Sequence, residues 1–504
     1  MKILHIYPKS PTTFWSFHHA LKFISKKASL PPLGLLTVAA MLPGDWEQRL
    51  IDMNVEEITD ADIRWADYVF LSAMSIQKES TLSVIARCKT LGVKVIAGGP
   101  MFTTYPEEFK DVDHLVLNEA EITLPLFLED LRNGRVKHVY TSPRWSEMRV
   151  TPLPRFDLVK MKKYASMNVQ YSRGCPFDCD FCNITVLYGR VPRTKDTKQL
   201  IDEFESLYAL GWRSSVFIVD DNFIGNKVKL KKEVLPAIIE WMVKRNYPFN
   251  LYTEVSINLA DDEELMQLMV KAQFNQVFVG IETPNEESLT ECSKLQNRNR
   301  DMIANVKKIQ KTGIEVQAGF IVGFDKDPAS IFDRLKAFIQ ESGIVTAMVG
   351  LLNAPQGTKL YYRLKQEGRL IKSTTGDNTD FSLNFIPKMN KDRLLKGYRD
   401  LLNTIYAPKY FYARLKEFLK EYRPVKATTK FKMKLNHLSA LIKSTIRLGI
   451  VGRERFQYWK LIVWSMFRKP KLLPLAITLS IYGFHFRKVF NKHEKTLLTR
   501  LSRQ

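Results

Sequence analysis

The stretch Tyr171-Ser-Arg-Gly-Cys-Pro-Phe-Asp-Cys-Asp-Phe-Cys182 decides the fold of this 504-residue chain. It sets Cys175, Cys179 and Cys182 at CxxxCxxC spacing, directly after a glycine that permits a sharp turn. Three thiolates on one short loop can bind three irons of a cubane cluster, whereas iron–sulfur clusters usually take four cysteines. One iron would therefore lack a protein ligand, and we expect a small molecule to complete its coordination.

A structural zinc site is the plain alternative, and it needs four nitrogen or sulfur ligands. No histidine lies between His138 and His437, and Cys292 is the only other cysteine nearby in the sequence, so a local zinc site lacks a ligand. A disulfide is not expected, because five cysteines are a sparse and odd number. The N-terminal residues 1–8 also read as a strand rather than a secretory signal. The cysteine pattern thus favours a cluster.

The residues around the cysteines carry a family resemblance. A short strand is expected at 168–171, immediately before the loop, and the aromatic Phe181 precedes the third cysteine. This arrangement resembles the radical S-adenosylmethionine (SAM) enzymes, whose CxxxCxxC loop follows the first strand of a partial α/β barrel. The resemblance implies a [4Fe-4S] cluster on Cys175, Cys179 and Cys182, with SAM on the open iron and Phe181 near the SAM adenine.

An incomplete (β/α)6 barrel is predicted between residues 166 and 370. Strand-like runs alternate there with helical stretches, at 168–171, 215–219, 249–253, 276–280, 315–322 and 346–352. Sites in such barrels lie at the carboxyl ends of the strands. By resemblance to the family, the polar residues after the runs are SAM contacts: Asp220, Asp221, Asn222, Glu254, Glu282, Thr283, Gly323 and Asn353. A single acid among them is equally well a helix cap, so their joint placement carries the prediction.

Residues 1–140 predict a doubly wound, Rossmann-like α/β domain with five strands, at 2–7, 46–53, 68–72, 94–97 and 114–117. Ligands of such sheets bind beyond the carboxyl ends of the strands. The residues there are Ser72, Ser75, Gly98, Gly99, Pro100, Asn118 and Glu119. The domain's place before a radical SAM loop resembles that of cobalamin (B12)-binding domains, which implies that these residues contact cobalamin. The Asp-x-His-x-x-Gly pattern of a lower cobalt ligand is absent, although His18 and His19 follow the first strand.

The remaining segments are an expected linker at 141–165, rich in proline, and a basic helical C-terminal domain at 371–504. The net charge is +23, and residues 391–504 hold 27 Lys and Arg against 6 Asp and Glu, so this region attracts anionic surfaces. Its apolar segments 461–467 and 472–486 are too short to span a membrane. They either lie among lipid headgroups or form a buried helical hairpin. A nucleic-acid partner is not expected, because residues 1–140 lack the second three-cysteine cluster of the tRNA methylthiotransferases.

The segments 31–36 and 377–389, with a helix expected at 394–406, resemble the hopanoid C-2 methylase subgroup of B12-binding radical SAM enzymes. The resemblance implies a cobalamin-dependent methyltransferase acting on an unactivated carbon of a hydrophobic lipid or isoprenoid, such as a hopanoid. It further implies an external flavodoxin- or ferredoxin-like electron donor. We expect a cytoplasmic protein, or one peripheral to the cytoplasmic membrane face. The alternatives are a B12-dependent radical SAM cyclase or oxidase, and a non-catalytic corrinoid or cluster carrier.

Overall fold

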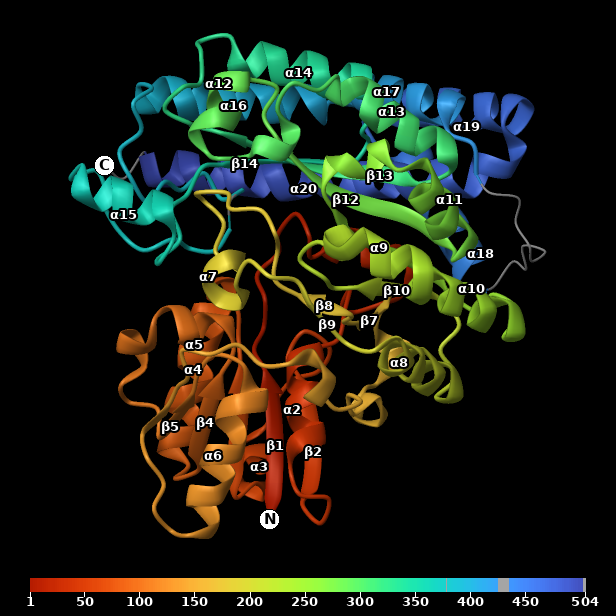
Figure 1. Cartoon of the computed structure of the whole chain (residues 1–504). Helices are drawn as coiled ribbons and strands as arrows, with labels where there is room; N and C mark the ends of the chain where they lie inside the picture. The colour runs from red at the N-terminus through yellow and green to blue at the C-terminus, as the bar shows by residue number, and fades with distance from the viewer. Residues whose placement is uncertain (378, 425–434, 502–504) are drawn as a thin grey trace. The chain divides into compact units, whose positions relative to one another are not determined.

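The computed structural model describes residues 1–377, 379–424 and 435–501 of the chain (Figure 1). The chain divides into two compact units. The first comprises Met1–Pro11, Lys27–Pro176 and Cys182–Asp221, and the second comprises Thr12–Lys26, Phe177–Phe181 and Asn222–Gln504.

The first unit contains a parallel sheet in the order β2-β1-β3-β4-β5-β6. Its strands are β1 Lys2–Tyr7, β2 Glu47–Asp52, β3 Tyr68–Ser72, β4 Lys94–Gly98, β5 His114–Val116 and β6 Val139–Tyr140. The helices between them are α2 Leu33–Met41, α3 Asp60–Trp65, α4 Lys78–Thr90, α5 Pro100–Thr104 and α6 Ala120–Arg132. This is the doubly wound fold that the sequence predicts, with a strand order that reverses at β1 and β3. The prediction of five strands was wrong by one, because β6 has two residues and shows no periodicity.

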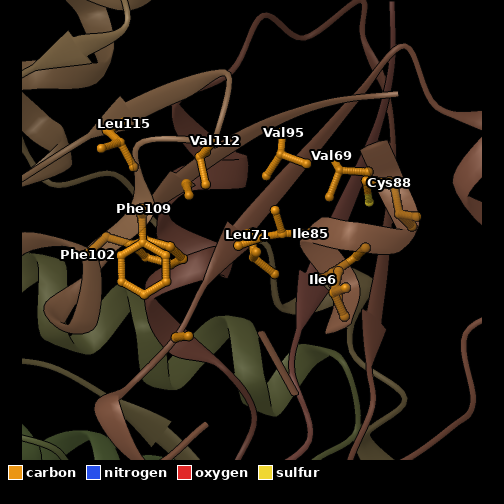
Figure 2. Packing of buried hydrophobic residues seen from close by; sticks show 14 of the residues in the cluster. Ile6, Val69, Leu71, Ile85, Cys88, Val95, Phe102, Phe109, Val112 and Leu115 are labelled. Atoms are coloured by element: carbon orange, nitrogen blue, oxygen red, sulfur yellow. The ribbon is translucent and has the colours of Figure 1, made fainter. Parts of the chain in front are cut away.

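Figure 2 shows one side of the core of this sheet, where apolar side chains of β1, β3, β4 and β5 meet those of α4 and α5. Ile6, Val69 and Phe102 are completely or almost completely buried, and each such side chain contributes about 1.5–3 kcal/mol through burial. Cys88 belongs to this core, and burial raises the pKa of its thiol to about 11. Cys88 is therefore a packing residue.

The rest of the first unit leads into the barrel. Short 3₁₀ turns at Met148–Val150, Phe156–Leu158 and Met161–Lys163 occupy the predicted linker. The elements after them are β7 Met167–Val169, β8 Ser172–Arg173, α7 Ile184–Tyr188, β9 Arg193–Thr194, α8 Thr197–Ala209 and β10 Ser215–Ile218. β7 and β10 pair in parallel, and β8 and β9 form a short antiparallel pair on either side of the cysteine loop.

The second unit contributes four parallel strands, each paired with the next in the chain. They are β11 Asn250–Val255, β12 Phe274–Glu282, β13 Glu315–Val322 and β14 Ala347–Leu351. The helices before, among and after them are α10 Leu235–Lys244, α11 Glu263–Lys271, α12 Glu286–Glu291, α13 Met302–Thr312, α14 Ile331–Ser342 and α15 Lys359–Gln366. All six predicted barrel strands are thus present. Glu254 was expected after its strand, but it lies inside β11, because the strand continues two residues beyond the apolar run.

The C-terminal region is helical, as predicted. Its helices are α16 Lys391–Ile405, α17 Pro408–Glu421, α18 Leu435–Ser444, a π-helical turn Thr445–Ile450, α19 Arg455–Arg468 and α20 Leu473–Leu501. Phe14, from the short segment that belongs to this unit, stacks on Phe486 of α20 with ring centroids 4.0 Å apart. In the described ranges, no helix has both the length and the apolar content that crossing a membrane requires.

Candidate active site

The cysteine loop starts from a fixed backbone turn after β8. Gly174 has φ 92°, in the left-handed region that suits glycine. A Cβ at this position would lie 2.8 Å from the Val191 carbonyl oxygen. The Cys175 N–H donates to the Gly189 carbonyl at 3.3 Å. The start of the loop therefore requires glycine and is held by its own downstream segment.

The middle of the loop is anchored in the second unit. The Asp180 N–H donates to the Cys292 carbonyl at 3.0 Å, and the Leu360 N–H donates to the Asp180 carbonyl at 2.9 Å. Cys179 is 9% exposed, and burial raises the pKa of its thiol. The Gln296 side-chain amide approaches the Cys179 Sγ to 3.9 Å. Cys179 thus has an amide donor beside its sulfur. Hydrogen bonds of this kind to a sulfur ligand tune the reduction potential of a bound cluster.

Asp220 and Asp221, after β10, bind the strand and turn that lead to the cysteines. Asp220 accepts hydrogen bonds from the Tyr171 N–H at 2.8 Å and the Ser172 hydroxyl at 2.6 Å. Asp221 accepts one from the Gly174 N–H at 2.8 Å. Burial raises the pKa of Asp220 to about 7 and that of Asp221 to about 6. The sequence analysis predicted that these acids contact SAM. In the structure they accept hydrogen bonds from residues 171–174 and so position the cysteine loop.

A buried ion-pair network joins the first turn of α6 to the cysteine loop. Arg173 pairs with Glu119 at 3.1 Å and with Glu121 at 2.8 Å, and Arg193 pairs with Glu119 at 2.8 Å. The carboxylates are each 2% exposed, and the two arginines are 12% and 13% exposed. Burial acts to raise the pKa of Glu121, but the Arg173 charge outweighs it and holds that pKa below its usual value. Glu119, a predicted cobalamin contact, thus serves as a bridge between the two segments.

The remaining predicted cobalamin residues gather at the carboxyl ends of β3, β4 and β5, which are neighbours in the sheet. A Cβ on Gly98 would lie 2.6 Å from the Val116 carbonyl oxygen, and one on Gly99 would lie 2.5 Å from the Ser72 Oγ. Pro100 begins α5 and Ser75 begins a 3₁₀ turn. Asn118 has φ 62°, and its side-chain oxygen accepts a hydrogen bond from Thr141 at 2.7 Å. Contacts within the protein therefore require glycine at both positions. The contacts of these residues with cobalamin stay predictions.

At the end of β12, Glu282 adopts φ 63° next to a register shift in the ladder. A positive φ at a residue with a side chain is strained and recurs at functional sites. The Glu282 carboxylate pairs with the Lys294 Nζ at 2.7 Å, with the two side chains 8% and 13% exposed. A Cβ on Gly280 would collide with this pair. The end of β12 therefore presents one anion and one cation in a confined space.

Three other predicted SAM residues follow β12, β13 and β14. Thr283 is fully buried and accepts a hydrogen bond from the Asn285 N–H at 3.2 Å. Gly323 has φ 107° and donates its N–H to Asp327 at 2.8 Å. Asn353 is 7% exposed, and its Oδ1 accepts no hydrogen bond from any residue that the structure describes. Because buried polar atoms are normally satisfied, Asn353 is the predicted residue that most needs a ligand.

The last three predicted SAM residues lie in different surroundings; they are Asn222, Glu254 and Phe181. The Asn222 side-chain oxygen accepts a hydrogen bond from the Ser256 N–H at 3.2 Å, which ties the segment after β10 to the end of β11. Glu254 is half-buried and lies opposite Phe278 of β12. Phe181 packs near Phe324, with ring centroids 6.2 Å apart, and both line a small apolar pocket.

The sequence analysis did not identify several residues of this region, above all Arg173, Arg193, Lys294 and Gln296. Arg173 precedes the glycine of the cysteine loop, and nothing in its local sequence marks it as a site residue. Its partner Glu119 is 54 positions away, and Lys294 is 12 positions from Glu282. No local spacing indicates such pairs, and an alignment of related chains would have been the signal needed to find them.

The donor set fits an open-site cluster. Cys175, Cys179 and Cys182 lie on one loop, and none of the three forms a disulfide among the residues that the structure describes. In the ranges that the structure describes, no three Cys, His, Asp or Glu side chains, those of the loop included, are arranged to hold a metal ion. The fit therefore rests on the chemistry and the spacing of the three thiols. Cys292 is 3% exposed in an apolar cluster, and its thiol lies 3.7 Å from the Leu289 carbonyl oxygen. Cys292 is thus a core residue.

Three family models match parts of the chain. Residues 24–128 match the B12 binding domain, residues 169–339 match the radical SAM superfamily, and residues 358–497 match a domain of unknown function, DUF4070. The protein is therefore a radical SAM enzyme with an N-terminal B12-binding domain. Its cofactors are a [4Fe-4S] cluster, SAM and cobalamin, and it needs an external source of single electrons.

The chain belongs to the cobalamin-dependent radical SAM methyltransferase family that includes hopanoid C-2 methylase. It is 31% identical to the hopanoid C-2 methylase of Rhodopseudomonas palustris over 93% of this chain and 90% of that protein. It is 42% identical to an uncharacterized methyltransferase of Synechocystis over 96% of this chain and 91% of that protein. The methyltransferase TsrM of Kitasatospora setae has the same fold, with a TM-score of 0.56 at 15% identity over 74% of this chain and 79% of that one. A cyclase or oxidase is not favoured.

Proposed function

We propose that this enzyme methylates an unactivated carbon of a hydrophobic isoprenoid lipid of the hopanoid class. The observation that carries the proposal is the 31% identity to hopanoid C-2 methylase over 93% of the chain, since the match extends through the C-terminal helical region. Hopanoid C-3 methylase of Methylococcus capsulatus is also similar, at 25% identity over 59% of this chain. Similarity of whole chains supports a shared substrate class more strongly than similarity of one domain.

In this proposal Cys175, Cys179 and Cys182 hold the cluster. When bound, the cluster, SAM and cobalamin supply the radical and methyl-transfer chemistry. Asp220 and Asp221 fix the start of the cysteine loop through the backbone of residues 171–174. The neighbouring charges of Glu282 and Lys294 suit the amino and carboxylate groups of SAM, while the unsatisfied Asn353 oxygen suits a hydrogen-bond donor on the same ligand.

The proposal includes a cellular location and an electron donor. A lipid substrate is reached most directly at the cytoplasmic face of a membrane, and the basic C-terminal region suits an anionic surface. A flavodoxin- or ferredoxin-like protein would supply the electrons.

The test is expression in a bacterium that makes hopanoids but adds no methyl group to their rings, grown with methyl-labelled methionine. We expect one labelled methyl group on the hopanoids by mass spectrometry, and none with the C175A/C179A/C182A variant. Unlabelled hopanoids from cells whose purified enzyme carries iron and cobalamin would refute the hopanoid assignment. Label on another lipid in the same extract would identify that lipid as the substrate and leave the hydrophobic substrate class unchanged.

A further inference from the structure

Helix α19 carries an exposed apolar stripe opposite its buried face. Phe456 and Phe467 are 74% and 76% exposed, and Trp459, Val463 and Met466 are between 42% and 48% exposed. At 100° per residue these five positions fall within about 100° of the helix circumference. Tyr458, Leu461 and Ser465, which the helix buries, lie on the opposite side. The stripe is therefore a second apolar face, left over after α19 has packed on the second unit.

The preceding segment continues this surface. Ile442, Ile446 and Ile450 recur every four residues through α18 and the π-helical turn, and they are 50–60% exposed. The Trp459 indole N–H donates to the Gly449 carbonyl at 2.9 Å, and the Ser444 and Tyr458 hydroxyls lie 3.2 Å apart. These contacts fix the two segments against each other. We name the exposed apolar residues of 438–467 the α18–α19 face.

Basic residues surround the α18–α19 face. Residues 438–471 contain eight Lys and Arg and a single acid, Glu454. Glu454 is buried and pairs with Arg487, so it does not neutralise the surface. Among the exposed cations, Arg453, Arg455 and Lys460 form no ion pair with a carboxylate in the described part of the chain, and the Arg455 guanidinium lies 5.0 Å from the Phe456 ring.

Such a composition matches one kind of partner. Large exposed apolar patches mark interaction sites, and a helix with aromatic residues on one face and unpaired cations beside it lies in the headgroup layer of an anionic bilayer. Helix α19 has 14 residues, about 21 Å at 1.5 Å per residue, so it fits along a membrane surface and cannot cross it. A second copy of the chain would bring the same cations together without counter-charges.

We propose that the α18–α19 face docks the enzyme on an anionic lipid membrane, with the apolar stripe inserted among the acyl chains and the cations at the phosphate level. This deepens the proposed function, since it gives the enzyme access to a membrane-held substrate. Docking nevertheless needs neither the cofactors nor methyl transfer, so it is tested separately.

The experiment is vesicle flotation of the full chain, with phosphatidylglycerol–phosphatidylcholine vesicles compared with phosphatidylcholine alone. We expect binding to the anionic vesicles that weakens as salt is raised. The variant R453Q/R455Q/K460Q should bind about fivefold more weakly for each charge removed, because one cation near an anionic surface contributes about 1 kcal/mol. The matched control K89Q/K94Q/K110Q removes three exposed lysines of the first unit and should bind as the unaltered chain does.

The apolar contribution is tested with F456S/V463S/F467S against V150S/V228S/V243S, which removes three side chains of similar exposure elsewhere. We expect at least a tenfold weaker vesicle binding for the first variant only, with an unchanged thermal midpoint in both. Equal binding by both variants, or equal binding of the unaltered chain to neutral vesicles, would overturn the proposal. A concentration-dependent dimer that F456S/V463S/F467S abolishes, without vesicle binding, would reassign the face to self-association. Vesicle binding without hopanoid methylation would refute only the substrate.

Discussion

Replacing Arg173 with methionine should destabilise the first unit strongly, because Arg173 is the cation shared by two buried carboxylates. Removing one partner of a buried pair costs about 3–5 kcal/mol, since it leaves an uncompensated buried charge. Glu119 would keep Arg193, and Glu121 would keep the Thr151 hydroxyl at 2.9 Å. We therefore expect a loss near the lower limit, about 3 kcal/mol, which lowers the melting temperature of a unit of this size by about 6–12 °C.

The matched control is Arg149→Met. Arg149 pairs with Asp196 at 3.1 Å, but the two side chains are 67% and 53% exposed, so the pair contributes about 1 kcal/mol at most. Urea unfolding of both variants gives the free-energy difference. Hydrogen exchange of peptides that cover 171–182 shows whether the loss falls at the cysteine loop. An Arg173 variant that loses no more stability than the Arg149 variant would refute the reasoning.

The Glu121 carboxylate makes the effect of the Arg173 substitution depend on pH. The pKa of Glu121 in the folded chain is below its usual value of 4.5. Its pairing with Arg173 therefore stabilises the fold above about pH 4.5, and this stabilisation is lost as the pH falls through the lower folded pKa. The difference between the unaltered chain and the Arg173 variant should be complete at pH 7 and shrink below pH 4.5. A difference that grows in acid would contradict the assigned charges.

Three further changes test the site. Gly174→Ala should cost more than Gly134→Ala, since both have positive φ but only Gly174 lacks space for a Cβ, and iron content after reconstitution should fall only for the former. The pKa of Asp220 in the folded chain, about 7, exceeds its unfolded value, so ionisation of Asp220 lowers the free energy of unfolding as the pH rises from about 4 to 7. Asp220→Asn should remove this pH dependence, which urea midpoints across that range would measure. Lys294→Met should weaken SAM binding to the reconstituted enzyme at least tenfold in equilibrium dialysis, whereas unchanged binding would exclude Lys294 from the SAM site.

The parts of the site that depend on local spacing could be predicted from the sequence. The six barrel strands were predicted correctly, because apolar runs are properties of short segments. The CxxxCxxC spacing also predicted the radical SAM superfamily, which the family match confirms. The strand ends were less certain: Glu254 lies inside β11, since a strand continues as long as its ladder is paired, whether or not its residues are apolar. The partners of the site residues could not be predicted. Asp220 binds Tyr171 across 49 positions, and only the fold brings them together.

Helices α19 and α20 show that the sequence pattern also does not predict which apolar helix faces are buried. Both have apolar residues on most sides, a pattern that marks a helix surrounded by apolar material but does not say which kind. The sequence left open whether these segments lie among lipid headgroups or form a buried hairpin, and the structure answers this for α20 alone. In α20, Ala476, Leu479 and Phe486 are completely buried, so that helix belongs to the protein core. In α19, Phe456 and Phe467 stay exposed among the residues that the structure describes, and the vesicle experiment tests whether a lipid surface covers them. Periodicity cannot separate these cases, because it records which residues are apolar and not how much of the surrounding core is already filled.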